Sequence, residues 1–148
     1  MKIAVASDEK THLTDFVVED LKKRGHEVRL FGPLVGDNLP WTLASEQLAD
    51  AVAAGEADEG VLFCYTGTGA SMAANKVPGI RAALCADAQT AKGARWWNDA
   101  NVLVMSLRAT SPEVAKEILD AWYLETVRPD EKATIDHLKD IEARHAQE

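Results

Sequence analysis

The sequence has 148 residues, the size of one ordinary domain, and its 47% hydrophobic and 27% charged residues are typical of a globular protein. Its net charge of −8 argues against nucleic acid as the main partner, because a phosphate backbone is bound by clustered lysine and arginine. No apolar run reaches the length of a membrane span, the N-terminus lacks a signal-peptide pattern, and two cysteines do not suggest a disulfide scaffold. We therefore expect a cytoplasmic protein with no membrane or nucleic-acid partner.

Apolar runs and helical patterns alternate from one end of the chain to the other. Short runs rich in valine and isoleucine predict strands, and apolar residues at helical spacing predict helices between them. In chain order, the predicted elements are a strand at 2–7, a helix at 14–25, a strand at 26–32, a loop at 32–40, a helix at 41–57, a strand at 59–64, a short helix at 71–79, a strand at 80–86, a helix at 88–98, a strand at 100–107, a helix at 111–124 and a charged helix at 130–147. Thr14 is expected to cap the first helix, and Ser111, followed by Pro112, the helix at 111–124.

Strands that alternate with helices over the whole length indicate a parallel sheet that is covered on both faces. We therefore expect a single α/β domain, residues 1–148, of the doubly wound, Rossmann-like kind, with three α/β/α layers and a five-stranded parallel sheet. In such sheets a ligand binds beyond the carboxyl ends of the strands. In this sequence those ends are followed by Asp8 and Glu9, by the segment 64–69 and by Arg108.

Cys64 ends the third predicted strand and begins the segment CYTGTGAS, which leads into a helix. The free N–H groups and the dipole of a helix N-terminus favour negative charge, so a thiol there is a candidate base or nucleophile. A small core residue before a tight turn is an equally good interpretation, because free cysteines are often simply buried. Cys85 lies within an apolar run, and we expect it in the core.

The loop after Cys64 is rich in glycine, and Gly67 and Gly69 would let its backbone approach a ligand closely. The loop matches neither the GxGxxG fingerprint of dinucleotide-binding domains nor the GK[ST] ending of a phosphate-binding P-loop. Its backbone amides remain a plausible binding site for an anion. The anion would be a carboxylate, a phosphate or an enediolate.

Other polar and aromatic residues have two interpretations each. Asp8 and Glu9 are either contacts for substrate hydroxyls or only a helix-start signal. His12 is either a proton shuttle or a solvated residue beside a loop. The pair Trp96 and Trp97 is expected to have a structural role, with stacking on the apolar face of a sugar as the alternative.

Polar groups that could hold a sugar phosphate occur in the second half of the chain. Side chains that could bind hydroxyls precede the last predicted strand, at Asn98, Asp99 and Asn101. The candidate cations for a phosphate are Arg81, Arg108, Arg128 and Lys132. No cluster of histidine, cysteine and carboxylate has the spacing of metal ligands, so we expect no metal.

Three stretches of the sequence together resemble the ribose-5-phosphate isomerase B / galactose-6-phosphate isomerase family. They are CYTGTGASMAANKVPGIRAALC from Cys64, ARWWNDANVLVMSLR from Ala94, and the opening KIAVASDE. The resemblance covers nearly the whole chain and implies an aldose–ketose isomerase without metal or cofactor that acts on a sugar or sugar phosphate through a cis-enediolate. It also implies a homodimer or a dimer of dimers with the site at the interface, and a helix at about 130–145 that packs on the partner subunit.

The resemblance implies a role for each residue that matches a family motif. Cys64 would be the base that moves a proton between C1 and C2. Thr66, in the same loop, is a further catalytic candidate, and His12 is one from its position near the loop rather than from a family motif. The amides of the loop would hold the enediolate oxygen, and Arg108, Arg128 and Lys132 would hold the phosphate. The expected substrate contacts are Asp8, Glu9, Gly67, Thr68, Gly69, Ala70, Ser71, Trp97, Asn98, Arg108, Arg128 and Lys132.

The sequence departs from the family pattern at three positions. Glu9 replaces a histidine that helps to hold phosphate, Trp97 replaces a histidine assigned to opening the sugar ring, and Lys132 replaces an arginine. Three hypotheses follow: an isomerase of a four-carbon sugar phosphate or of an unphosphorylated sugar, a ribose-5-phosphate isomerase in which His12 replaces the missing histidine, and a non-catalytic sugar-binding relative. The retention of Cys64 beside a complete loop argues against the third hypothesis, because a mere binder needs no base.

Overall fold

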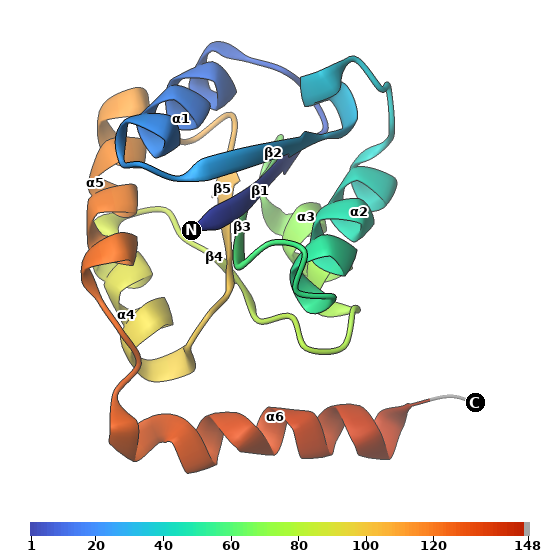
Figure 1. The fold of residues 1–148 in the computed structure, drawn as a ribbon, viewed down its shortest axis with the longest axis vertical. Helices are drawn as coiled ribbons and strands as arrows, with labels where there is room; N and C mark the ends of the chain where they lie inside the picture. The colour runs from blue at the N-terminus through green and yellow to red at the C-terminus, as the bar shows by residue number, and fades with distance from the viewer. Residues whose placement is uncertain (147–148) are drawn as a thin grey trace.

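A five-stranded parallel sheet forms the centre of the computed structural model, in which residues 1–146 are described (Figure 1). The strands are β1 (Lys2–Ser7), β2 (Glu27–Phe31), β3 (Glu59–Cys64), β4 (Ala82–Leu84) and β5 (Val102–Ser106). The α-helices are α1 (His12–Lys23), α2 (Trp41–Ala53), α3 (Thr68–Asn75), α4 (Ala88–Asn98), α5 (Pro112–Leu124) and α6 (Lys132–His145), and the 3-10 helices are η1 (Gly32–Val35) and η2 (Pro129–Glu131). The predicted α/β architecture is confirmed.

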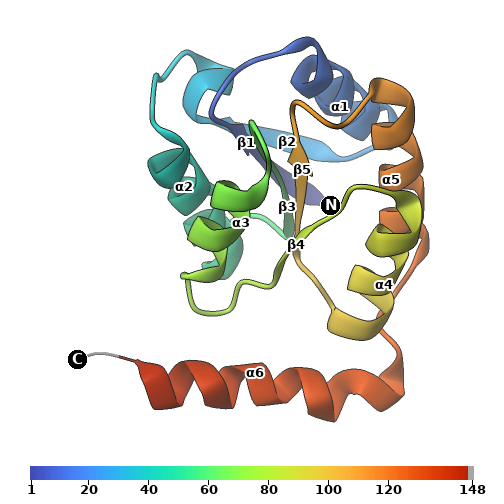
Figure 2. The same cartoon turned by 180° about the vertical axis from the view of Figure 1, so that it is seen from behind.

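The strands lie in the order β2-β1-β3-β5-β4, and every neighbouring pair is parallel. Helices α1, α4 and α5 cover one face of the sheet, and α2 and α3 cover the other (Figures 1 and 2). From β1 the chain moves outwards to β2 and then returns to the other side of β1 at β3. The strand order therefore reverses between β1 and β3, and in a doubly wound sheet this switch point is where a ligand binds.

The central strands are buried on both faces, which explains their continuous apolar runs. Every residue of β3 and β5 is buried. Because side chains alternate along a strand, Val61 and Phe63 belong to the core cluster that contains Trp122 of α5, while Leu62 and Cys64 pack with residues of α2 and α3. Cys64 thus points towards the face that is covered by α3, the helix that follows its own loop.

The N-cap of α1 differs from the prediction, whereas the N-cap of α5 agrees with it. Helix α1 begins at His12, because the hydroxyl of Thr11 accepts the N–H of Thr14 at 3.3 Å and the hydroxyl of Thr14 accepts the N–H of Thr11 at 2.9 Å. The prediction that Thr14 is the N-cap was therefore wrong, since Thr14 is the second partner of a capping box. Ser111 caps α5 as predicted, by accepting the N–H of Val114 at 3.2 Å.

The elements on either side of the loop 76–81 also differ in extent from the prediction. Helix α3 begins at Thr68 rather than at residue 71, because Gly67 adopts a left-handed conformation with φ 80° and turns the chain directly into the helix. Strand β4 has only three residues of the predicted 80–86. The Asn75 side chain is hydrogen-bonded to the backbone of Ala82. It donates to the C=O at 2.9 Å and accepts the N–H at 2.8 Å. Cys85, just beyond β4, is fully buried, as expected of a core residue.

Helix α6 lies apart from the three layers and crosses one end of the domain (Figure 1). Its Glu142 accepts the N–H of Gly79 at 3.1 Å, which places the helix beside the amino ends of the strands. A hollow of about 390 Å³ lies between α6 and this end of the domain, and Leu138 and Ile141 line it while remaining 43% and 40% exposed. That α6 packs on a partner subunit stays a prediction. Among the described helices, none has the length and apolarity needed to cross a membrane.

Candidate active site

The sulfur of Cys64 is hydrogen-bonded to the loop that follows it. It accepts the backbone N–H of Gly67 at 3.2 Å and that of Ala70 at 3.4 Å. Gly67 is the N-cap of α3 but has no side chain, so the sulfur takes the position that a capping oxygen normally fills. Two N–H donors and the positive end of a helix dipole favour negative charge on this atom. Cys64 is only 5% exposed, yet its sulfur lies under the loop rather than among apolar groups alone.

Neighbouring groups pack closely against both glycines of the loop. A Cβ on Gly67 would lie 2.5 Å from Cδ1 of Leu84 and 3.3 Å from the backbone of Met105. A Cβ on Gly69 would lie 3.0 to 3.3 Å from three atoms of the Trp41 ring. The loop is therefore held between the ends of β4 and β5 on one side and the start of α2 on the other.

Trp41 lies beside the loop, although the sequence did not predict it as a candidate site residue. Its ring lies against Gly69, and 42% of the residue is exposed beside the loop. The sequence did contain a signal, because a large aromatic residue stands at the first position of a predicted helix, directly after Pro40. Only the fold brings that helix start next to the segment after β3. An exposed indole at this point offers an apolar face to a sugar.

The remaining loop residues present polar groups at the start of α3. The hydroxyls of Thr66 and Thr68 lie 2.7 Å apart, and both residues are exposed. Ser71 lies one turn further along α3 and is half-buried. The N–H groups of Thr68 and Gly69 belong to the first turn and have no acceptor within the helix. This part of the loop can therefore bind an oxyanion through its backbone.

Asp8 follows β1 and lies beside the loop across the switch point of the sheet. Ser7 is opposite Phe63 in the β1–β3 register, so Asp8 lies next to Cys64 and Tyr65. Burial raises the pKa of the Asp8 carboxyl above its ordinary value, against the opposing effect of a hydrogen bond with the Tyr65 backbone. Its Oδ1 is buried and has no hydrogen-bond partner among the described residues. A buried acceptor in this position is suited to a hydroxyl of a bound sugar.

Arg108 supplies positive charge at the same edge of the sheet. Its backbone N–H donates to the carbonyl of Tyr65 at 3.0 Å. It lines a hollow of about 200 Å³ together with Thr66 and Ser106. The guanidinium is exposed and forms no ion pair or hydrogen bond within residues 1–146, so it is available to a phosphate.

Four of the expected site residues lie near the end of α4 rather than beside Cys64. The end of α4, with Trp97 and Asn98, precedes β5, whose first residue is level with Gly60, whereas Cys64 is level with the last residue of β5. Four residues of strand separate these levels, which corresponds to roughly 13 Å. Arg128 and Lys132 follow α5, and the carbonyl of Trp96 accepts the Arg128 N–H at 2.9 Å, which ties them to the end of α4.

Glu9 and His12 lie at the same edge of the sheet as Cys64, and both are exposed. Glu9 is exposed after β1, and His12 is exposed as the first residue of α1. No hydrogen bond joins the imidazole of His12 to any residue within the described part of the chain. Within residues 1–146, no three side chains of histidine, cysteine, aspartate or glutamate lie close enough to hold a metal ion.

These features define a doubly wound α/β domain in which a cysteine sulfur at the switch point of the sheet is hydrogen-bonded by the backbone of a glycine-rich loop. The family model described as ribose/galactose isomerase matches residues 3–140, and the chain belongs to this family. Ribose-5-phosphate isomerase B of Escherichia coli is 43% identical over 106 residues, 72% of this chain and 71% of that protein. D-erythrulose-4-phosphate isomerase of Pectobacterium atrosepticum is 38% identical over 120 residues, 80% of this chain and 76% of that protein.

The solved structures agree with the sequence relatives. The structure of ribose-5-phosphate isomerase B from Clostridium thermocellum superimposes with a TM-score of 0.91 at 35% identity and covers 99% of this chain and 100% of that chain. The type B ribose 5-phosphate isomerase of Trypanosoma brucei gives a TM-score of 0.85 at 35% identity, with 95% and 97% covered. The expected family and the expected class, a sugar-phosphate isomerase, are thereby confirmed.

Proposed function

We propose that Cys64 is the base of an aldose–ketose isomerase and moves a proton between C1 and C2 of an open-chain sugar phosphate. The sulfur takes the C2 proton of the aldose, the electrons of that C–H bond form the C1–C2 double bond, and the negative charge falls on O1. Transfer of the O2 hydrogen to O1 and return of the proton to C1 give the ketose. The charge on the enediolate oxygen is stabilised by N–H groups at the start of α3.

One observation carries this proposal. The sulfur of Cys64 is held by two backbone N–H groups at a helix N-terminus, directly across the switch point from a buried and unpartnered Asp8 oxygen. The loop can therefore hold both the sulfur and an oxyanion beside it, while Asp8 accepts a sugar hydroxyl. Thr66 and Arg108 complete the part of the site that one chain supplies.

The second part of the site is proposed to come from a partner subunit in a homodimer. We assign Trp97, Asn98, Arg128 and Lys132 to the site of the partner, because they belong to or follow the end of α4, and that end leads into β5 four residues before the level of Cys64. Exposed apolar residues surround the edge strand β4, namely Met72 at 66%, Leu84 at 38% and Trp97 at 47% exposure. Helices α3 and α4, which carry Met72 and Trp97, flank this edge of the sheet (Figure 2). An interface of two-fold symmetry here would bring the end of α4 to the loop of the partner.

The substrate is proposed to be a short phosphorylated sugar. A four-carbon sugar phosphate cannot close a furanose ring through the carbon that bears the phosphate, so it needs no ring-opening step. The indole at position 97 suits such a substrate, because indole nitrogen only donates and cannot act as a base. Ribose 5-phosphate is the second candidate, supported by the names of several relatives. Both cysteines are free, which suits the reducing cytoplasm where we place the enzyme.

The test is isotope exchange in D₂O with a panel of four- and five-carbon aldose and ketose phosphates and the matching free sugars. We expect deuterium at C1 or C2 of a phosphorylated sugar with the wild-type protein, and a loss of about 10²- to 10⁴-fold in Cys64→Ala. Exchange that persists in Cys64→Ala would overturn the role of the thiol. Binding without exchange on any sugar would identify a non-catalytic relative, and exchange on free sugars alone would overturn the phosphorylated substrate.

A further inference from the structure

The turn between α4 and β5, residues 98–101, has an unusual backbone. Asp99 adopts a left-handed conformation with φ 48°, and within residues 1–146 no other non-glycine residue has a positive φ. Glycine, asparagine and aspartate all adopt this conformation more readily than other residues, so the backbone alone does not decide which of them stands here. The side chain of Asp99 therefore needs an explanation of its own.

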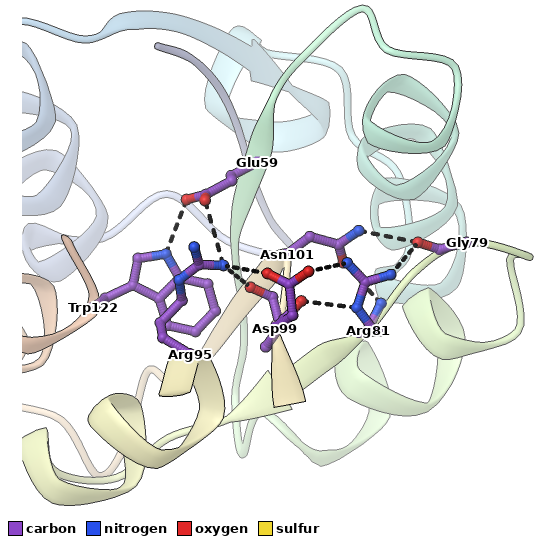
Figure 3. A network of polar contacts seen from close by, with 8 residues as sticks. Glu59, Gly79, Arg81, Arg95, Asp99, Asn101 and Trp122 are labelled. Atoms are coloured by element: carbon purple, nitrogen blue, oxygen red, sulfur yellow. Dashed lines mark hydrogen bonds and ion pairs between the residues drawn. The ribbon is translucent and has the colours of Figure 1, made fainter. Parts of the chain in front are cut away.

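On one side the turn is tied to the core through Arg95. Nη1 of Arg95 lies 3.6 Å from Oδ1 of Asp99 and 3.5 Å from Oε2 of Glu59, and it donates to the carbonyl of Ala100 at 2.5 Å. Glu59, at the start of β3, also accepts the indole N–H of Trp122 at 3.0 Å (Figure 3). The side chains of Arg95 and Glu59 are only 13% and 11% exposed, so this connection reaches into the interior.

On the other side the turn is tied to the chain before β4 through Arg81. Nε of Arg81 donates to the carbonyl of Asp99 at 2.8 Å, and Nη2 lies 3.5 Å from Oδ2 of the same residue. Asn101 accepts the N–H of Arg81 at 2.7 Å and donates to the carbonyl of Gly79 at 3.0 Å. Asp99 therefore lies between two arginines that approach from different elements (Figure 3).

The residues that this turn carries have little support of their own. Trp97 and Asn98 are exposed, and within the described chain neither side chain forms a hydrogen bond. Trp97 rests on Trp96, with ring centroids 5.9 Å apart, and on the bare backbone of Gly93. Both are the last residues of α4, directly before its C-cap Asp99, so the two arginines that hold Asp99 also hold the end of this helix.

We infer that Asp99 is a positioning residue, which with Arg95 and Arg81 holds Trp97 and Asn98 where the partner subunit's active site needs them. This inference rests on the proposed function, in which each site is completed by the end of the partner's α4. Misplacing a substrate-binding group by about 1 Å can cost on the order of 10²-fold in rate, so rigid support of an exposed turn has a catalytic value. A purely structural network would stabilise its own chain and would have no effect on the site of the partner.

The test uses Asp99→Asn, which keeps the size and the left-handed backbone and removes the charge. We expect a folded dimer with a kcat/KM reduced on the order of 10- to 100-fold. The decisive sample is a hybrid dimer of one Asp99→Asn chain and one Cys64→Ala chain, co-expressed with two tags and purified in tandem. One of its sites carries both changes and the other carries neither, so the hybrid should recover about half of the wild-type activity.

Each outcome decides whether Asp99 positions the partner's site or serves only the stability of its own chain. An Asp99→Asn homodimer with full activity overturns the inference, as does a hybrid that is no more active than that homodimer. The hybrid of Asn98→Ala with Cys64→Ala tests the shared site itself: if it regains no activity, the proposed function fails, and if it alone regains activity, only the role of Asp99 fails. If Asp99→Asn gives no folded dimer, Arg81→Met replaces it, because that change leaves the pairing of Arg95 with Glu59 intact.

Discussion

Arg128 is held by Asp130 in a two-pronged ion pair, with Nε 3.0 Å from Oδ1 and Nη2 2.7 Å from Oδ2. The guanidinium also lies over the ring of Trp96, 5.2 Å from its centroid. The hydrogen bonds from Arg128 hold the pKa of the Asp130 carboxyl below its ordinary value. A residue that the family resemblance assigns to phosphate binding is thus occupied by a carboxylate of its own chain, and a phosphate must compete with Asp130 for it.

Asp130→Asn should therefore strengthen the binding of phosphorylated substrates. We expect KM to fall by about two- to fivefold for a sugar phosphate and to stay unchanged for the matching free sugar, because exposed ion pairs are modest in strength. Steady-state kinetics on both substrates measure the change. Asp50→Asn is the matched control, since it makes the same charge change at an exposed residue of α2. An equal fall of KM for both sugars, or none, would contradict the prediction.

Trp97→His should broaden the substrate range towards sugars that form rings. A histidine can donate and accept a proton, as ring opening requires, whereas an indole cannot. We expect kcat for ribose 5-phosphate to rise on the order of tenfold relative to kcat for a four-carbon sugar phosphate. Trp97→Phe is the control for loss of the indole alone. A parallel rise on both substrates would show that the histidine does not act in ring opening.

Gly67→Ala should disrupt the loop that holds the sulfur. The residue has φ 80°, and its added Cβ would lie 2.5 Å from Leu84, so we expect a loss of about 2–4 kcal/mol in the free energy of unfolding together with loss of activity. Gly55→Ala separates the two causes, because Gly55 has φ 78° with nothing within 4 Å of the added Cβ. Chemical denaturation measures both variants. Equal losses in the two would mean that backbone strain alone matters.

Asp8→Asn should raise the stability of the protein and lower its activity. Burial raises the pKa of Asp8 from 3.8, so the folded state binds this proton more tightly than the unfolded chain does. Stability is therefore lost as the pH rises from 3.8 through the raised pKa, and at pH 7 the wild type holds an ionised, partly buried carboxylate. Asparagine does not titrate. We expect a higher Tm than wild type at pH 7, and a kcat/KM about tenfold lower or more.

The pH dependence of the Tm difference is the check on this sign. The advantage of Asp8→Asn should shrink as the pH is lowered from 7 towards 4, because the wild-type carboxyl then regains its proton. Asp50→Asn, with an exposed carboxyl, should show no comparable trend. A variant that is less stable than wild type at pH 7 would mean that the carboxylate is held by stabilising interactions rather than penalised by burial.

Local patterns in the sequence determined the elements and the part of the site that belongs to one stretch of chain. The apolar run that ends at Cys64 and the glycines that follow it place a thiol at a helix N-terminus in any parallel α/β sheet, because the strand, the turn and the helix are consecutive. The cap of α1 was misread because Thr11 and Thr14 are both good capping residues, and their reciprocal bonding is a matter of three-dimensional geometry. The same holds for β4, whose first residue, Ala82, is hydrogen-bonded by the side chain of Asn75 from across a loop.

The sequence by itself determined the alternating order of strands and helices, the family and the presence of a thiol on an amide loop, because each is written in neighbouring residues. Only the tertiary structure decided which distant residues meet. It brought Asp8 and Trp41 to the loop after Cys64, placed the start of β5, which follows the end of α4, four residues below the level of Cys64, and paired Arg128 with Asp130. The physical reason is that the sheet order and the direction of each helix set these distances, and both result from the packing of the whole chain.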